Sequence, residues 1–277
     1  MFEIPEREKI TFHNDFINRV VVAGAYNNNR SCTTNRQALK DRYANTLPLQ
    51  SDNPQQQYQI NFDVRTKQTS VNANVDEQDR QITLRSKNMQ KELTLMNNSF
   101  RYQEVGDSYG TSVTFDNTVQ PAIDYLKGTG ITQLNMMKLQ KVNVIGYEMG
   151  KKDGVESPVP YWQPASNLIN VRLVPQYDAM MGVASNIRQH ISNLILTDGA
   201  YVLTIKYGFR LTEKKPDGSM AKGQVIVDLE IERKTPVAID AVADELTLMH
   251  KELYNAFLWS ISDSYVNLLD QGKEAQV

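Results

Sequence analysis

The fold is decided by a stretch near the C-terminus, in which two alternating segments precede a long amphipathic one. The first segment reads YVLTIKYGFRL (residues 201–211) and the second reads QVIVDLEIERK (residues 224–234). Apolar residues occupy alternate positions in both, which is the periodicity of a strand with one buried face. Pro216, Asp217 and Gly218 lie between the segments and favour a turn. Residues 201–233 are therefore predicted to form a β-hairpin.

After the hairpin, apolar residues recur in steps of three and four from residue 239 to residue 269. This spacing keeps one side of a helix apolar over about eight turns. A single long helix is therefore predicted over about 239–269, packed against a sheet or another helix. Its apolar positions are Ile239, Val242, Leu246, Met249, Leu253, Phe257, Ile261, Tyr265 and Leu268.

Upstream of the hairpin, shorter segments alternate in the same way. Regular alternation of apolar and polar residues gives each strand one solvent-exposed face. This favours an antiparallel sheet over a parallel one. A helix is predicted over about 115–127, with Pro121 near its start. The segment 139–149 is apolar on both faces and is predicted to be a central strand. The other predicted strands are 19–26, 60–64, 71–75, 82–84, 93–95, 100–102 and 189–196.

These elements predict an α+β fold, with one or more antiparallel sheets covered by the mid-chain helix and the long C-terminal helix. Strands followed by a helix occur twice, so we expect two halves, residues 1–150 and 151–277. The segment 151–164 holds Gly154 and three prolines and is the predicted junction. Either the sheets of the two halves join through 139–149, or the halves are separable domains.

Residues 27–57 are rich in Asn and Gln and poor in large apolar side chains. This composition predicts a polar insertion, either a surface loop or a partly ordered segment, in which 36–44 could form one short helix. The alternative is a binding arm that orders against a partner, because long loops are often functional. Arg36 and Arg42 are its candidate interaction residues.

The overall composition narrows the class of protein. The 277 residues include 30 basic and 32 acidic ones, so net charge does not draw the chain to nucleic acid, although a local basic patch stays possible. Cys32 is the single cysteine, which suits a reducing compartment. No apolar segment is long enough to span a membrane, and residues 1–9 do not resemble a signal peptide. We expect a cytoplasmic protein.

The residues of types that catalyse reactions or bind metals and phosphates do not form a recognisable motif. Asp228, Glu230 and Glu232 make a row along one strand, but carboxylates at strand spacing do not converge on a metal ion by themselves. Cross-strand ion pairs with Lys206 and Arg210 explain the row without chemistry. The glycines match no phosphate-binding loop. We therefore predict no catalytic, metal or cofactor residues.

Large aromatic side chains are the better candidates for an interaction site. Tyr161 and Trp162 lie among prolines, where an aromatic pair must dock on the protein's own core or on a partner. Trp259 lies beside the apolar stripe of the long helix and could extend it into a second apolar face. That face would allow helices to pack between subunits.

The pattern is similar to a sporadically distributed, uncharacterised bacterial family of α+β proteins of about this length. The matching residues are the strand Val227–Ile231, and then His250, Phe257 and the pair Ser262 and Asp263 in the long helix. The similarity covers most of the chain from Tyr58 onward, whereas residues 27–57 depart from the family pattern. The resemblance implies the fold described above and no activity.

Three hypotheses for function follow. The first is a non-enzymatic interaction protein of bacterial or phage origin: an adaptor, a chaperone-like holder or an assembly subunit, which binds a protein partner or itself. The second is a structural component of a phage or another multi-subunit particle. The third is a metal-dependent nuclease that uses Asp228, Glu230 or Glu232.

Overall fold

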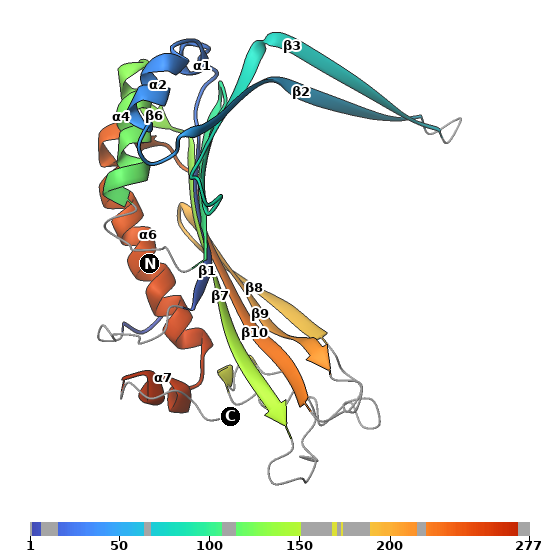
Figure 1. The fold of residues 1–277 in the computed structure, drawn as a ribbon. Helices are drawn as coiled ribbons and strands as arrows, with labels where there is room; N and C mark the ends of the chain where they lie inside the picture. Colours follow the sequence, from blue (N-terminus) through green and yellow to red (C-terminus); the bar gives the residue numbers. More distant parts are fainter. Residues whose placement is uncertain are drawn as a thin grey trace. The chain divides into compact units, whose positions relative to one another are not determined.

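The computed structural model describes residues 2–6, 16–63, 68–106, 115–150, 168–170, 173, 189–214 and 220–270. Their main feature is a large antiparallel sheet accompanied by a few helices (Figure 1). Neighbouring strands follow the order β2-β3-β4-β5-β1-β7-β10-β9-β8. The predicted α+β class with an antiparallel sheet is thus confirmed.

The strands of this sheet are β1 (Ile17–Ala25), β2 (Leu49–Asp63), β3 (Gln68–Arg85), β4 (Lys91–Leu95), β5 (Ser99–Val105), β7 (Met136–Gly150), β8 (Gln189–Asp198), β9 (Tyr201–Lys214) and β10 (Met220–Arg233). A small sheet pairs β6 (Gln133–Leu134) with β11 (Val237–Ala238). The helical elements are α1 (Ser31–Thr34), α2 (Arg36–Arg42), η1 (Phe115–Val119), α4 (Gln120–Gly128), η4 (Ile239–Ala241), α6 (Val242–Ser260) and α7 (Asp263–Asp270). Within the described residues, none of these helices combines the length and apolar character needed to cross a membrane.

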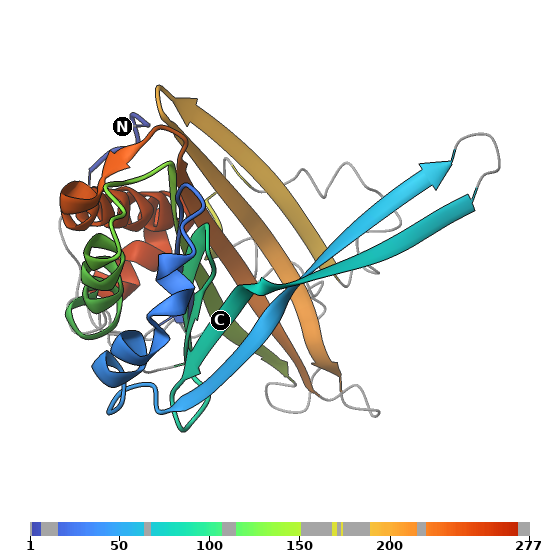
Figure 2. The ribbon, with the colours of Figure 1, turned by 90° about the horizontal axis from the view of Figure 1, so that it is seen from above.

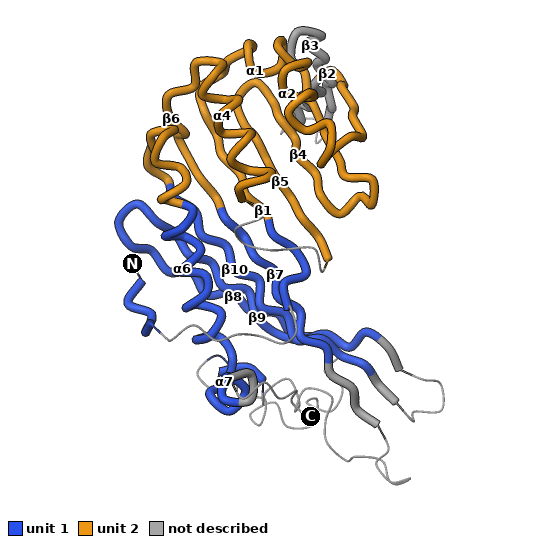
Figure 3. The backbone as a smooth tube through the Cα atoms, turned by 60° about the vertical axis from the view of Figure 1, so that its left-hand side comes forward, with its two compact units in different colours: residues 1–20, 139–233, 246–277 blue, residues 21–138, 234–245 orange. Residues whose placement is uncertain are grey.

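The chain forms two compact units whose segments alternate along the sequence (Figure 3). Unit 1 comprises residues 1–20, 139–233 and 246–277, and unit 2 comprises residues 21–138 and 234–245. β1, β7 and α6 each begin in one unit and end in the other. The units therefore do not coincide with residues 1–150 and 151–277.

In unit 2, the order β2-β3-β4-β5-β1 follows from successive antiparallel hairpins up to β5. Figure 1 shows α1, α2 and α4 on one face of these strands. The strand residues that turn to that core alternate in sequence, as a period of two requires. The fully buried ones are Ile82, Leu84, Leu93, Leu95, Phe100 and Tyr102. The strands predicted at 71–75 and 82–84 are two parts of one strand, β3.

The prediction of a loop over residues 27–57 is wrong. The segment contains α1, α2 and the start of β2, and the helix expected within 36–44 is confirmed as α2. Cys32, Leu39, Tyr43 and Leu47 are fully buried. Three of them lie four residues apart, so a few apolar side chains at helical spacing anchor an otherwise polar segment.

Two tyrosine hydroxyls fasten this segment to the rest of unit 2. Tyr43 donates a hydrogen bond to the carbonyl of Thr118, and Tyr125 of α4 donates one to the carbonyl of Cys32 at 2.7 Å. The Tyr125 hydroxyl also lies 3.2 Å from the Asn35 carbonyl. Because α1 ends at Thr34, the two Tyr125 contacts cap carbonyl groups at the end of this short helix.

Unit 1 contains the predicted hairpin and central strand. β9 and β10 pair from Tyr201↔Arg233 to Lys214↔Ala221, with a register shift between Lys222 and Gly223. Residues 215–219 lie outside the described part. Figure 2 shows β8, β9 and β10 side by side. β7 has a strand on each side, as its apolar composition predicted. The buried face of β9 and β10 consists of Leu203, Ile205, Phe209, Val225, Val227, Leu229 and Ile231.

The prediction of a single long helix over 239–269 is wrong in one respect, because the helix is interrupted. α6 ends at Ser260, Ile261 makes a bridge to Ile169, and α7 begins at Asp263. The residues 168–170 bind the backbone at the break: Asn170 donates to the Ser260 carbonyl at 3.0 Å, and Ser262 donates to the Leu168 carbonyl at 2.8 Å. The apolar stripe continues in phase through the break, so periodicity alone does not reveal it.

We predict that unit 2 loses stability in alkali through its buried tyrosines. Burial raises the pKa of Tyr125 to about 12, with the nearby Cys32 adding to the shift, whereas an unfolded tyrosine has a pKa of about 10. The folded state thus favours the protonated phenol. Its contribution is complete below about pH 10 and is lost as the pH rises toward about 12.

Urea unfolding at a series of pH values measures this effect. The free energy of unfolding should fall less steeply between pH 10 and 12 in Tyr125→Phe than in the wild type. At neutral pH the variant should be less stable by about 1 kcal/mol, because it loses the bonds to the carbonyls. Parallel pH curves for the two proteins would contradict the role given to Tyr125.

Candidate functional site

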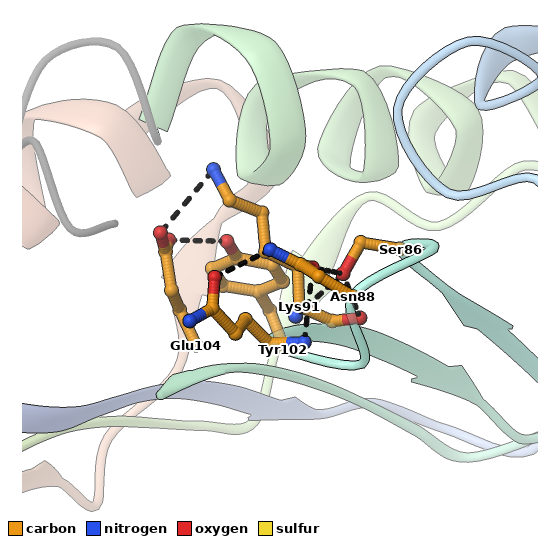
Figure 4. Close-up of polar contacts among 6 residues, drawn as sticks. Ser86, Asn88, Lys91, Tyr102 and Glu104 are labelled. Carbon is orange, nitrogen blue, oxygen red and sulfur yellow. Dashed lines mark hydrogen bonds and ion pairs between the residues drawn. The ribbon is translucent and has the colours of Figure 1, made fainter. Parts of the chain in front are cut away.

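A buried polar cluster in unit 2 is the first candidate (Figure 4). Tyr102 and Glu104 lie two residues apart on β5 and share its buried face. The Tyr102 hydroxyl donates to the Glu104 carboxylate at 2.6 Å. Lys91 lies directly opposite Glu104 on β4, with its ammonium 3.2 Å from the same carboxylate. We call these three residues the Glu104 cluster.

The turn before β4 positions the lysine of this cluster. Ser86 exchanges hydrogen bonds with the backbone of Lys91: the Ser86 amide donates to the Lys91 carbonyl at 2.9 Å, and the Lys91 amide donates to the Ser86 hydroxyl at 2.9 Å. The Ser86 hydroxyl in turn donates to the Asn88 side chain at 2.7 Å. A serine and an asparagine at these positions are typical of turns in which side chains satisfy the backbone.

The Glu104 cluster has the groups of an acid–base site, but it lacks access. Both Tyr102 and Glu104 are closed to solvent, and the Glu104 carboxylate already has a hydroxyl donor and an ammonium partner. A general base must lie within hydrogen-bonding reach of its substrate. The cluster therefore acts as a buried bridge between β4 and β5, where its satisfied charges fix the register.

A second buried polar pair lies in unit 1, between the sheet and α6. Lys141 of β7 is only 6% exposed, and its ammonium lies 2.8 Å from Nδ1 of His250. An ammonium can only donate, so the imidazole ring accepts in this contact. Asn143, the next inward residue of β7, donates to the Val227 carbonyl at 3.1 Å. These contacts show that His250 is a packed helix residue.

The carboxylate row on β10 is engaged across the sheet. Asp228 accepts a hydrogen bond from Gln140 of β7 at 2.7 Å and lies 3.9 Å from the ammonium of Lys206, its partner in the β9 register. Glu230 lies opposite Thr204. The cross-strand arrangement predicted from the sequence is thus present at Asp228. Within the described part of the chain, no group of three or more His, Cys, Asp or Glu side chains is placed to hold a metal ion.

Cys32 is a packed thiol and not an exposed one. Its sulfur lies 3.2 Å from the Thr129 hydroxyl, and burial raises the pKa of the thiol. A nucleophilic cysteine needs the opposite, a lowered pKa and access to a substrate.

Three of the predicted interaction residues, Trp259, Arg36 and Arg42, lie in the described part of the chain. Tyr161 and Trp162 lie outside the described residues. Trp259 is partly exposed near the end of α6, and its carbonyl accepts a hydrogen bond from Asn170 at 2.6 Å. Arg36 pairs with Asp52 at 2.7 Å, and Arg42 is exposed in the last turn of α2.

The surface that the sequence did not reveal is β8. Among the described residues β8 pairs with β9 alone, so it is an edge of the sheet. Ile191 and Ile195 share the outer face of β8 and are 41% and 62% exposed. Residues 189–197 include no acidic, lysine, arginine or proline residue, which is the only signal of this surface in the sequence. We call residues 189–197 the β8 edge.

Backbone packing beside the β8 edge is unusually close. Gly208 of β9 lies opposite Ile191 and has a φ of +154°. A Cβ atom at this position would lie 1.9 Å from the carbonyl oxygen of His190. Only glycine fits here, so β8 is held tightly on its β9 side.

Comparison with known proteins gives no further lead, because no family model and no curated protein matches the sequence. The candidate surfaces must therefore be judged on their own geometry and chemistry.

We predict that the Glu104 cluster contributes to stability. Tyr102→Phe removes a donor from a buried carboxylate and should lower the free energy of unfolding by about 1–3 kcal/mol, as measured by urea denaturation. Tyr207→Phe is the matched control, because Tyr207 is partly exposed and should change stability by less than about 0.5 kcal/mol. Equal effects of the two substitutions would show that the Tyr102 hydroxyl contributes nothing specific.

Proposed function

We propose that the protein is a non-enzymatic interaction protein that binds an extended segment of a protein partner along the β8 edge. Strand addition is one mode by which an adaptor, a chaperone-like holder or an assembly subunit binds its partner. The observation that carries the proposal is an edge strand of the described sheet that is free of Asp, Glu, Lys and Arg over residues 189–197 and has two exposed isoleucines on one face.

The backbone of the β8 edge supplies the first part of the argument. An edge strand presents a row of N–H and C=O groups that another strand can pair with. Proteins usually guard such edges with lysine, proline, bulges or short length. β8 runs over ten residues, and the described register with β9 is continuous from Gln189 to Asp198. It is therefore a long and regular template for strand addition.

The side chains on the outer face of β8 supply the second part of the argument. Ile191 and Ile195 lie four residues apart, about 13 Å along a strand, and would contact alternate residues of an added strand. Asn193 lies between them and Lys206 lies opposite Asn193 on β9. Polar groups thus lie between and beside the two exposed isoleucines, as apolar and polar groups do in a protein interface.

The inner face of β8 also favours apolar residues in an added strand. Leu194 and Leu196 are partly exposed and lie opposite Ile205 and Leu203, which are fully buried. An added strand with apolar residues on this face would continue the buried layer of β9 and β10. The partner segment is therefore an extended strand, uncharged along its length and apolar at several alternate positions.

The other two hypotheses differ in how well they agree with this proposal. A structural component of a phage or another particle remains compatible with it, because a neighbouring subunit is able to supply the added strand. The nuclease hypothesis has no observation in its favour, since Asp228 is engaged by Gln140 and Lys206. A cytoplasmic location and a bacterial or phage origin stay predictions.

Affinity purification of the native complex from the host tests the proposal. Ile195→Lys places a charge on the β8 edge and should reduce recovery of the partner about tenfold, which corresponds to about 1.4 kcal/mol. Leu248→Lys is the matched control, because Leu248 is a 40% exposed apolar residue of α6. Partner recovery should be unchanged with the control.

Two results would overturn the proposal. One is equal recovery of the partner with Ile195→Lys and with the wild type. The other is a parallel loss with Leu248→Lys, which would show a response to charge anywhere on the surface.

A further inference from the structure

The β8 edge itself matches the description of the segment that it is proposed to bind. That segment is an extended strand, uncharged along its length and apolar at alternate positions. Residues 189–197 form one regular strand beside β9 (Figure 2), and they include no Asp, Glu, Lys or Arg. Ile191 and Ile195 supply the alternate apolar positions. The chain therefore carries a strand that is suited to pair with its own edge.

We propose that two copies of this chain associate by antiparallel pairing of their β8 strands. The inference rests on the proposed function of the β8 edge and names a second copy of the chain as its partner.

The two faces of β8 select the symmetry of this pairing. A twofold axis normal to the sheet makes the two β8 strands antiparallel and keeps the outer faces of both copies on the same side. A twofold axis along the strands would instead join the outer face of one copy to the inner face of the other. Only the first axis continues the buried layer of one copy into that of the second.

The order of residues along β8 selects the position of the axis. Asn193 is the middle residue of 189–197, so an axis through Asn193 pairs the whole stretch with itself. Ile191 of one copy then lies opposite Ile195 of the other, and the symmetry repeats this pair. An axis shifted to residue 192 or 194 would set each isoleucine opposite an Asn, Gln or Thr. The isoleucines therefore fix one register.

The inner face and the nearby charges are compatible with the same register. On the inner face, Leu194 lies opposite Ser192 and Leu196 lies opposite His190, so no two ionisable side chains oppose each other. On the outer face, Lys206 lies beside Asn193 on β9 and 3.9 Å from Asp228.

Repulsion between the two copies of Lys206 is small. Two β8 strands separate them, so their backbones are about 14 Å apart, which is three strand spacings. This distance exceeds the Debye length of about 8 Å at physiological ionic strength.

A pair of nine-residue strands makes a small interface. It buries roughly 900 Å² in total, less than the about 1,200 Å² at which stable specific interfaces begin. We therefore expect a reversible dimer with a dissociation constant on the order of 10 μM. At concentrations well below this value, the chain is a monomer whose β8 edge is not paired with a second copy.

Sedimentation velocity of the full-length protein, at concentrations below and above this value, tests the inference. The wild type should pass from monomer to dimer. Ile195→Lys sets a charge opposite Ile191 of the other copy and should raise the dissociation constant at least about tenfold. Leu248→Lys, which adds the same charge on α6, should leave it unchanged. A wild type that stays monomeric, an unchanged dimer with Ile195→Lys, or equal losses in the two variants would each overturn the inference.

Cysteine cross-linking tests the position of the axis. Asn193→Cys sets two thiols opposite each other at the axis. Thr197→Cys is the matched control, because Thr197 is exposed on the same face but the axis places its two copies about 26 Å apart along the strands. With diamide as the oxidant, the disulfide-linked dimer should form at least about tenfold faster in Asn193→Cys than in Thr197→Cys. Equal rates would overturn the arrangement.

Partner capture from the host separates this inference from the proposed function. A purified protein that stays monomeric, while Ile195→Lys still reduces capture of a host protein of different sequence, overturns the inference and leaves the proposed function standing. If neither dimer formation nor capture responds to Ile195→Lys, both are overturned.

Discussion

The structure depends on the burial of one face of an antiparallel sheet. On β10 the four inward residues Val225, Val227, Leu229 and Ile231 are fully buried, and the alternate residues between them are partly exposed. A slip of one residue in this register would bring Asp228 and Glu230 into the core. The inner face of β10 is therefore buried in the core, and its register is fixed by that burial.

Buried polar contacts further stabilise the packing of neighbouring elements. Lys141 and His250 join β7 to α6 in unit 1, and Lys91, Tyr102 and Glu104 join β4 to β5 in unit 2. Each contact satisfies a group that would be costly to bury alone, and together they favour one alignment of the elements. These side chains thus act as structural contacts between neighbouring elements.

Periodicity in the sequence predicted much of the fold, because hydrophobic spacing is a local signal. It identified the hairpin 201–233, the central strand that became β7, and the helix that became α4. The break between α6 and α7 was missed because residues 168–170, distant in sequence, bind the backbone there. The segment 27–57 was misjudged by composition, although Leu39, Tyr43 and Leu47 carry helical spacing that was available.

The candidate surface was harder to predict than the fold. Edge strands follow from strand order, and order is set by non-local pairing that a single sequence does not display. Residues 189–196 were predicted as a strand, but nothing local distinguishes an edge strand from an inner one except the lack of charge. Arg36 is a candidate interaction residue by its sequence context, and in the structure it pairs with Asp52.

Hydrogen exchange at the β8 amides, in the isolated protein and in its native complex, tests the central claim most directly. We predict that about half of the amides of residues 189–198 exchange fast in the isolated protein, since alternate amides point away from β9, and that these become protected in the complex. β9 should stay protected in both. Full protection of β8 in the isolated protein, or no change on complex formation, would contradict the account.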